Sequence, residues 1–295
     1  MLEPGYMAAE QEAEKKLQEW GITSLPVDPI EIADRLDILV HPKPDTAEGV
    51  SGMLVRHGNN FGILYATHID NEGFQRFSVA HELGHFLLEG HIDHIFPNGE
   101  GEHVSRAGFV SHDPYELEAD LFAAGLLMPN PMFSEALKRT EPGLEAIEEL
   151  SSLCVTSLNA TAIRYAKCAD HPVAIIVSTD LHIDYCVMSD PFKSIKGLEW
   201  LRKRQPLPRA SHTYQFNQDR KRVAHAERDE GVSSLPSWFG GGTRLDLVEE
   251  VWGLGSYGKT LTVLRPIISP EADEDEEEQE FERNLIESWT PRFRK

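Results

Sequence analysis

Residues 74–91 read FQRFSVAHELGHFLLEGH and contain the pattern His81-Glu82-x-x-His85. Residues four apart lie one turn apart on the same face of an α-helix, so His81 and His85 can bind one cation between their imidazole rings. Glu82 is rotated by about 100° from His81, which places it beside such an ion rather than on it. Neutral imidazole suits zinc, and catalytic zinc sites use three protein ligands. The pattern therefore predicts a Zn²⁺ centre with Glu82 as its acid/base.

The flanking residues favour a helix through this stretch. Apolar or small residues recur at helical spacing, at Phe77, Ala80, Gly84 and Leu88. Asn71 suits the N-cap and Gly90 suits the end. A glycine costs about 1 kcal/mol relative to alanine inside a helix, so Gly84 indicates that another segment packs closely there. A chain with 13 histidines can match the motif by chance, so the assignment of a zinc site also depends on a third protein ligand elsewhere in the chain.

Composition limits the class of protein. A chain of 295 residues with 40% hydrophobic residues can form two or three compact units. Neither an apolar run of about 18 residues nor a signal peptide is visible, so we expect no membrane span and a cytoplasmic location. The three cysteines are widely spaced, at Cys154, Cys168 and Cys186. They favour reduced thiols over a disulfide scaffold or a thiolate zinc site.

Charge is distributed unevenly along the chain. The net charge is −21, and residues 271–280 (EADEDEEEQE) form an acidic tail that we expect to be solvated. The basic clusters at residues 202–204 and 220–222 are expected to be solvated and paired with nearby acids. A strongly acidic protein binds DNA weakly through non-specific phosphate contacts, so direct DNA binding is not expected.

A small sheet is predicted ahead of the motif. Residues 7–20 and a segment beginning at Pro29 favour helices, the latter with Asp28 as N-cap. Residues 38–41, 49–56 and 61–67 favour strands, and HGNN between the last two predicts a hairpin turn. The edge of such a sheet can bind an extended peptide.

A second helix is predicted over residues 115–128, YELEADLFAAGLLM, and Pro129 ends it. Glu116 and Asp120 lie one turn apart at its beginning. Glu116 would complete a His₂Glu zinc site, and Asp120 would accept the other N–H of a ligand histidine. Both acids could instead stabilise the N-terminus of the helix, but the upstream motif favours the ligand role. Glu118 is a competing carboxylate on a different face.

Four further histidines lie between the motif and residue 113. His91 falls where the pattern H-E-x-x-H-x-x-G-x-x-H has its third histidine, but that pattern needs glycine at the place of Leu88. A helix continuing through Leu88 would carry His91 roughly 15 Å along the axis from His81, so we rank His91 below Glu116. Residues 91–113 are expected to form a long functional loop. Its three later histidines, His94, His103 and His112, are expected to face solvent, with donation by one of them to a reaction oxyanion as the alternative.

HELGH followed by ELEADLFAAGLLMP resembles the ImmA/IrrE family of bacterial and phage zinc metallopeptidases, over about residues 25–130. The positions that match the second family motif are Glu116, Ala119, Asp120, Phe122, Ala123, Leu126, Leu127, Met128 and Pro129. The resemblance implies a gluzincin-like site, with zinc on His81, His85 and Glu116 and with Glu82 as catalytic acid/base. It also implies a substrate: a helix-turn-helix repressor of the xenobiotic-response type, cleaved to relieve repression after DNA damage or other stress.

The rest of the chain resembles the family less strongly. Residues 142–168 favour two helices with a turn near Val155, similar to the helix-turn-helix-like region of IrrE-type members. Arg164 and Lys167 are nearly the only cations there, so packing or partner docking is expected rather than DNA reading. Strands are predicted at residues 173–179, 183–188, 245–251 and 260–264, with loops between the second and third. By resemblance, this region is a GAF-like domain.

The sequence thus predicts an α+β protein in four parts. These are a zincin-like metallopeptidase domain (residues 1–140), a helix-turn-helix-like segment (141–170), a GAF-like α+β domain (171–268) and an acidic tail (269–295). The predicted function is that of a zinc metalloendopeptidase that cleaves a repressor. Two alternatives remain: a regulator that binds DNA or a repressor without cleaving it, and a sensor or antitoxin-partner protein with structural zinc.

Overall fold

The computed structural model describes residues 4–43, 49–106 and 113–267, in two compact units. The described residues up to Ile175, with Val187–Lys193, form the first unit, and Ile176–Cys186 with residues 194–267 form the second. Helices and sheets occur in both, so the predicted α+β class is confirmed. His112 and the acidic tail lie outside the described residues. None of the described helices combines the length and apolar character needed to cross a bilayer.

The first unit is built on a four-stranded sheet with the order β1-β3-β2-β4. Its strands are β1 (Leu39–Lys43), β2 (Val50–His57), β3 (Asn60–Ala66) and β4 (Gly101–Arg106). β2 and β3 form the predicted hairpin, with His57 opposite Asn60. Gly58 supplies the left-handed residue of the turn, with φ of 61°. β4 pairs with β2 in antiparallel orientation and is the last strand on its side of the sheet.

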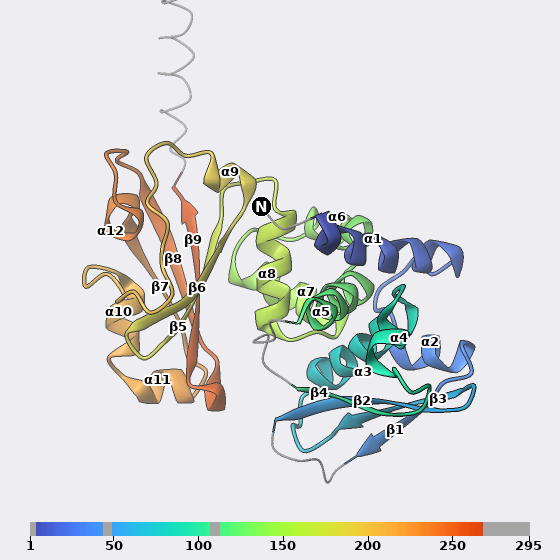
Figure 1. The fold of residues 1–295 in the computed structure, drawn as a ribbon. Helices are drawn as coiled ribbons and strands as arrows, with labels where there is room; N and C mark the ends of the chain where they lie inside the picture. The colour runs from blue at the N-terminus through green and yellow to red at the C-terminus, as the bar shows by residue number, and fades with distance from the viewer. Residues whose placement is uncertain (1–3, 44–48, 107–112, 268–295) are drawn as a thin grey trace, which may run out of the picture. The chain divides into compact units, whose positions relative to one another are not determined.

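Helices lie on one side of this sheet (Figure 1). They are α1 (Pro4–Glu19), α2 (Pro29–Arg35), α3 (Glu72–Leu87), α4 (His91–Ile95), α5 (Pro114–Leu127), α6 (Asn130–Leu137), α7 (Leu144–Cys154) and α8 (Leu158–Cys168). The motif helix α3 packs on β2 and β3, and α5 packs on α3 and α1. The site residues therefore lie between a sheet and a second helix.

The caps and the close contact predicted from the sequence are present. The Asp28 side chain accepts hydrogen bonds from the first turn of α2, and Asn71 accepts one from the Phe74 N–H at the start of α3. A Cβ added at Gly84 would lie 3.2 Å from the Ala119 Cα on α5, so these two helices touch through backbone. This contact brings the beginning of α5 next to the two motif histidines.

The expectation of a loop over residues 91–113 is wrong for much of this segment. α4 and β4 occupy part of it, and β4 places Val104 opposite Met53 of β2. Only Ser105 of β4 is buried, so the strand lacks the alternating apolar pattern by which a strand is recognised in a sequence. Its pairing with β2 is a tertiary interaction that local sequence does not encode.

Helices α7 and α8 confirm the two helices predicted within residues 142–168, and Val155 adopts the left-handed turn conformation, with φ of 52°, between them. Arg164 is buried and pairs with Glu10 of α1 at 2.9 Å. Lys167 also pairs with Glu10, at 3.2 Å. The two cations of this segment are thus engaged with α1.

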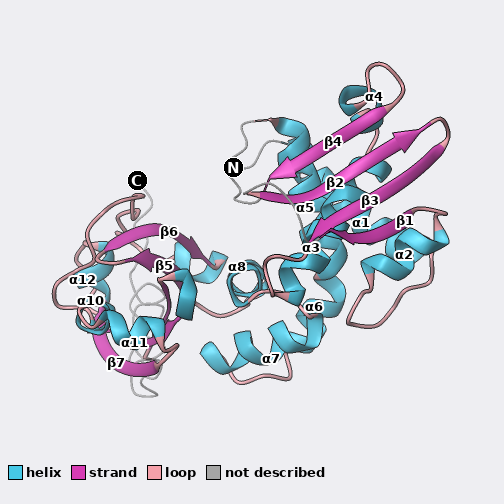
Figure 2. Cartoon of the chain, turned by 90° about the horizontal axis from the view of Figure 1, so that it is seen from below, coloured by secondary structure: helices cyan, strands magenta, loops and turns pink. Residues whose placement is uncertain are grey.

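The second unit contains a five-stranded sheet with the order β6-β5-β9-β8-β7 (Figure 2). Its strands are β5 (Ala174–Thr179), β6 (His182–Met188), β7 (Arg228–Ser234), β8 (Asp246–Gly253) and β9 (Lys259–Pro266). The short helices of this unit are α10 (His212–Asn217), α11 (Arg220–Ala224), α12 (Leu235–Phe239) and the 3₁₀ helix η1 (Gly255–Tyr257), whereas α9 (Asp190–Lys193) belongs to the first unit. α10 packs on β7 and β8.

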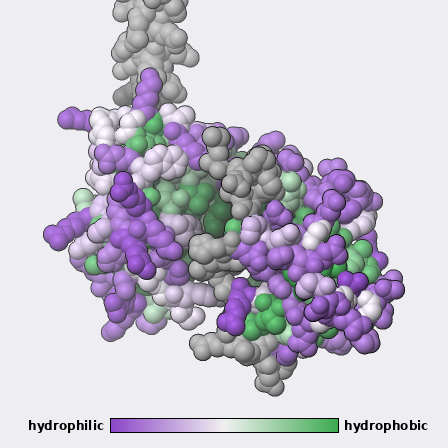
Figure 3. Space-filling view, in the orientation of Figure 1, coloured by the Kyte–Doolittle hydropathy of each residue, from purple (hydrophilic) through white to green (hydrophobic). Residues whose placement is uncertain are grey.

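The loops expected between β6 and β8 are present only in part. Residues 202–204 and 240–243 lie outside helices and strands, but α10, α11, β7 and α12 occupy other parts of this stretch. β7 reads RDEGVSS and is an edge strand whose one large apolar residue, Val232, is exposed. The three helices have only five or six residues each, too few to show a helical period. On the face shown in Figure 3, hydrophilic residues cover most of the described surface.

Candidate metal centre

Three side chains from two helices meet at one point in the first unit. The Nε2 atoms of His81 and His85 lie 3.1 Å apart on α3. Glu116, in the first turn of α5, places its two carboxylate oxygens 3.3 Å from these nitrogens. Tetrahedral ligands at about 2.0–2.1 Å from a zinc ion lie about 3.3 Å from one another. The spacing of the three groups therefore fits a zinc ion, and it brings together the three predicted ligands.

Asp120 orients the first histidine. Its Oδ1 lies 2.9 Å from the Nδ1 of His81, and because an ionised carboxylate only accepts, the imidazole donates. A neutral His81 therefore has its lone pair on Nε2, toward Glu116. Burial alone would lower the pKa of His81, but hydrogen bonds to Asp120 and Glu116 outweigh it and raise the pKa to about 10. The metal-free site thus holds a proton where a cation would bind.

The pKa values of Glu116 and His85 are both lowered, whereas that of His81 is raised. Burial opposes ionisation of Glu116, but hydrogen bonds from His103 and His81, with the His85 imidazole also close by, hold the pKa of Glu116 far below the ordinary range. Burial lowers the pKa of His85 to about 4, so this imidazole is neutral at neutral pH. An ionised carboxylate and a neutral imidazole are the forms that bind a metal ion.

Glu82 is completely buried, and neither carboxylate oxygen has a hydrogen-bond partner among the described residues. It packs against β2, where a Cβ added at Gly52 would lie 2.6 Å from Oε1. Burial raises its pKa to about 6. A carboxylate with a pKa near neutrality, next to a ligand triad, is suited to transfer protons.

His103 lies at the site, so the expectation of a solvent-facing loop residue is wrong. Its Nε2 is 3.0 Å from Glu116 Oε1, and its ring centroid is 4.7 Å from that of His85. The reason is the pairing of β4 with β2, which sets His103 opposite Leu54. No local feature of the sequence could have shown this.

His91 is also close to the site, although it is not one of the three converging ligands. α3 ends at Leu87, and Gly90, with φ of 82°, turns the chain back, so the expected continuation of the helix through Leu88, which would have carried His91 away from His81, is wrong. His91 is completely buried, and its Nδ1 lies 3.1 Å from the Nδ1 of His85. Glu118 lies 3.1 Å from the Nε2 of His91, on the far side of the ring from His85. His94 is half-exposed and stacks on Tyr115 at 3.9 Å.

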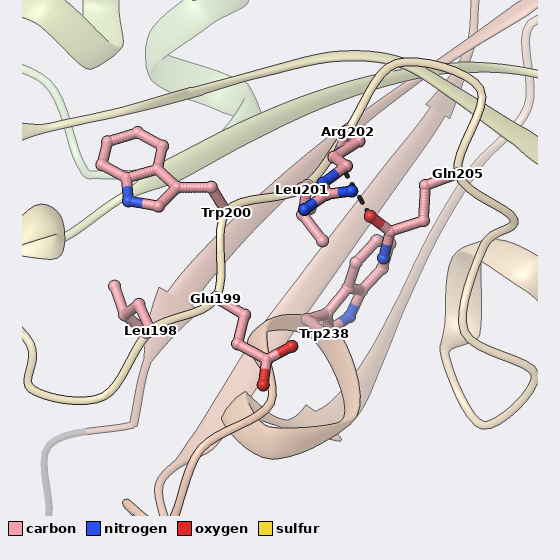
Figure 4. A pocket seen from close by; sticks show the side chains of 7 residues that line it. All are labelled: Leu198, Glu199, Trp200, Leu201, Arg202, Gln205 and Trp238. Atoms are coloured by element: carbon pink, nitrogen blue, oxygen red, sulfur yellow. Dashed lines mark hydrogen bonds between the residues drawn. The ribbon is translucent and has the colours of Figure 1, made fainter.

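The second unit contains a pocket of about 590 Å³ (Figure 4). The residues that line it are Leu198, Glu199, Trp200, Leu201, Arg202, Gln205 and Trp238. Trp200 is 67% exposed, and the Arg202 backbone N–H donates to the Gln205 side chain at 3.0 Å. Within residues 4–43, 49–106 and 113–267, only His81, His85 and Glu116 form a group able to hold a metal ion. The first unit therefore has the stronger candidate site.

Comparison with known proteins agrees with this geometry. Residues 33–165 match the family model of the IrrE N-terminal-like domain. These residues belong to the ImmA/IrrE family. Over 105 residues, the chain is 34% identical to the radiation response metalloprotease IrrE of Deinococcus radiodurans, and the match covers 35% of this chain and 29% of that protein. The segment of this chain that matches the family model contains His81, Glu82, His85 and Glu116.

A solved structure also resembles this chain. It is a Mycobacterium tuberculosis transcriptional regulator, with a TM-score of 0.55 and 15% sequence identity. The similarity covers 88% of this chain and 76% of that one. At this identity, the likeness concerns the fold alone.

Proposed function

We propose that the chain is a zinc-dependent endopeptidase with His81, His85 and Glu116 as metal ligands and Glu82 as acid/base. The observation that carries the proposal is the ligand triad, with atoms 3.1 to 3.3 Å apart, beside the buried Glu82 carboxylate, which has no hydrogen-bond partner in the described part of the chain. Zinc, when bound there, would supply Lewis acidity and lower the pKa of a coordinated water to about 7. Membership in the ImmA/IrrE family supports the same reaction class.

The protein's own groups divide the work of peptide hydrolysis. Glu82 would take one proton from the attacking water as the new carbon–oxygen bond forms at the scissile carbonyl. It would then give that proton to the amide nitrogen as the carbon–nitrogen bond breaks, which balances the reaction. Its pKa, raised by burial to about 6, suits both roles. Asp120 and His103 would hold His81 and Glu116 in place through their hydrogen bonds.

The sheet offers a place for an extended substrate. β4 carries His103 beside the triad and is an edge strand among the described strands. An extended peptide can add to such an edge through backbone hydrogen bonds. This arrangement supports a protein substrate whose scissile segment is unfolded or exposed.

The identity of the substrate rests on the family. We propose a helix-turn-helix repressor of the xenobiotic-response type, whose cleavage would relieve repression in a stress or DNA-damage response. Arg164 and Lys167 are engaged with Glu10, which supports docking or packing by α7 and α8 rather than DNA reading. A GAF-like sensor role for the second unit and a cytoplasmic location belong to the same proposal. The three cysteines are unpaired, as a reducing compartment favours.

The test is cleavage of the repressor encoded next to the gene of this protein. Purified wild-type protein with Zn²⁺ should cut it, and Glu82→Gln should cut about 10² to 10⁴ times more slowly. Zinc binding by Glu82→Gln should persist, because Glu82 is not a ligand. Glu89→Gln, the same change at an exposed position near the end of α3, is the matched control.

An equal rate for Glu82→Gln would contradict the mechanism. Sequence-specific, salt-dependent operator binding by the intact chain, without cleavage of the repressor, would instead favour a non-proteolytic regulator.

A further inference from the structure

We infer that His91, anchored by Glu118, is a positioning residue that fixes the tautomer of His85 required for metal binding. The inference rests on the metal site of the proposed function and extends it to two residues outside the triad. His85 and His91 are both completely buried, and their Nδ1 atoms lie 3.1 Å apart. Two imidazole nitrogens form a hydrogen bond only when one carries a hydrogen and the other presents a lone pair.

Glu118 decides the direction of this hydrogen bond. Its Oε2 lies 3.1 Å from the Nε2 of His91, and because an ionised carboxylate only accepts, His91 donates there. A neutral His91 that carries its hydrogen on Nε2 has its lone pair on Nδ1. That lone pair accepts the Nδ1–H of His85. The lone pair of His85 is therefore on Nε2, the atom that lies 3.1 Å from His81 and 3.3 Å from Glu116.

The two ligand histidines are thus oriented in different ways. His81 donates directly to the carboxylate of Asp120, whereas His85 donates to a second imidazole that in turn donates to a carboxylate. Partners of this kind orient metal ligands, and their removal lowers metal affinity about 10- to 100-fold. His91 and Glu118 have the position and the polarity to act on His85 in this manner.

Local structure holds this relay in place. The left-handed turn at Gly90 returns the chain after α3, and His91 then begins α4. The Tyr115 ring packs edge-on against His91, with centroids 4.9 Å apart. Glu116 and Glu118 lie two residues apart on α5, so they are rotated by about 200°. The same helix turn therefore supplies one carboxylate to the triad and another to His91.

A buried histidine can also serve packing alone, and substitution chemistry separates the two roles. Asn at position 91 can present its carbonyl oxygen near the place of Nδ1, so His91→Asn retains an acceptor for His85. His91→Phe keeps a ring of similar size but has no acceptor. The positioning role predicts that metal affinity follows the presence of the acceptor rather than the size of the side chain.

The experiment is titration of the full chain with Co²⁺, followed by absorbance, and competition with Zn²⁺. His91→Phe and Glu118→Leu should bind both ions about 10- to 100-fold more weakly, and His91→Asn should stay within about 3-fold of the wild type. His94→Phe, on the same short helix and outside the relay, should leave both affinities unchanged. Thermal unfolding of the metal-free proteins accompanies each titration.

The outcomes separate this inference from the proposed function. A wild-type chain that binds neither ion would overturn the proposed function. If the wild type binds and His91→Phe binds equally well, or if His91→Asn loses as much affinity as His91→Phe, the relay is refuted. Should His91→Phe fail to fold, Glu118→Leu decides, because that side chain is 31% exposed and can be changed at the edge of the site; undiminished affinity there would refute the relay.

Discussion

Gly52 on β2 controls the position of the proposed acid/base. A Cβ added there would lie 2.6 Å from Glu82 Oε1, and ordinary contact begins at 3.4 Å, so the carboxylate oxygen must move by about 0.8 Å in Gly52→Ala. A displacement of about 1 Å at a reacting group can cost 10²-fold in rate. We therefore expect Gly52→Ala to lower kcat for peptide hydrolysis by about 10- to 100-fold. Overpacking should also lower the free energy of unfolding by about 1 to 3 kcal/mol.

The assay is cleavage of the repressor under saturating Zn²⁺, with Zn²⁺ affinity measured in parallel. Affinity should be unchanged, because Gly52 contacts Glu82 and not a ligand. Gly62→Ala on the neighbouring strand is the matched control, since its added Cβ would meet the Leu39 carbonyl oxygen at 3.5 Å, an ordinary contact. Wild-type kcat in Gly52→Ala, or an equal loss in Gly62→Ala, would refute this account of how Glu82 is placed.

Four further results are expected. Without metal, the pKa of His81 is raised to about 10, so zinc must displace a proton from this imidazole when it binds. The affinity for Zn²⁺ should therefore weaken by about tenfold for each pH unit below 10. A Kd from calorimetry that does not change with pH would contradict this. That proton also stabilises the metal-free fold, fully below pH 6.5 and progressively less as pH rises toward 10, which denaturation at several pH values can check. Asp120→Ala should weaken Zn²⁺ binding about 10- to 100-fold, and unaltered competition titrations would exclude its orienting role. Arg164→Met should lower the free energy of unfolding by about 2 kcal/mol, because it leaves the partly buried Glu10 with only Lys167 as a partner. Lys167 is more exposed, so Lys167→Met should lower the free energy of unfolding by less than about 1 kcal/mol. Equal denaturant midpoints for the two variants would contradict this ranking.

Local rules were sufficient to predict the centre of the site. The motif spacing places His81 and His85 on one helical face whatever surrounds them. Asn71 and Asp28 cap helices through hydrogen bonds within three residues, so they too can be read from the sequence. To predict Glu116 as a ligand also required the assumption that α5 packs against α3 at Gly84, because this packing brings Glu116 to the two histidines.

Nonlocal pairing explains what the sequence could not show. His103 reaches Glu116 only because β4 pairs with β2, and β4 has no apolar alternation. His91 returns to His85 because Gly90 adopts a left-handed conformation, whereas helical geometry alone would have carried it away. In both cases tertiary structure decides where the histidine lies: the sequence marked Gly90 as a helix end but not the direction in which the chain continues, and it did not mark β4 as a strand.

The backbone contact between Gly84 and Ala119 has a consequence for how the proposed metal site comes into being. Its ligand set is assembled by tertiary packing of α3 on α5 rather than by one continuous segment. A newly made or damaged copy in which α3 and α5 are not packed together lacks the complete set of proposed metal ligands. The proposed affinity for zinc would then appear and vanish together with the native packing of α3 on α5.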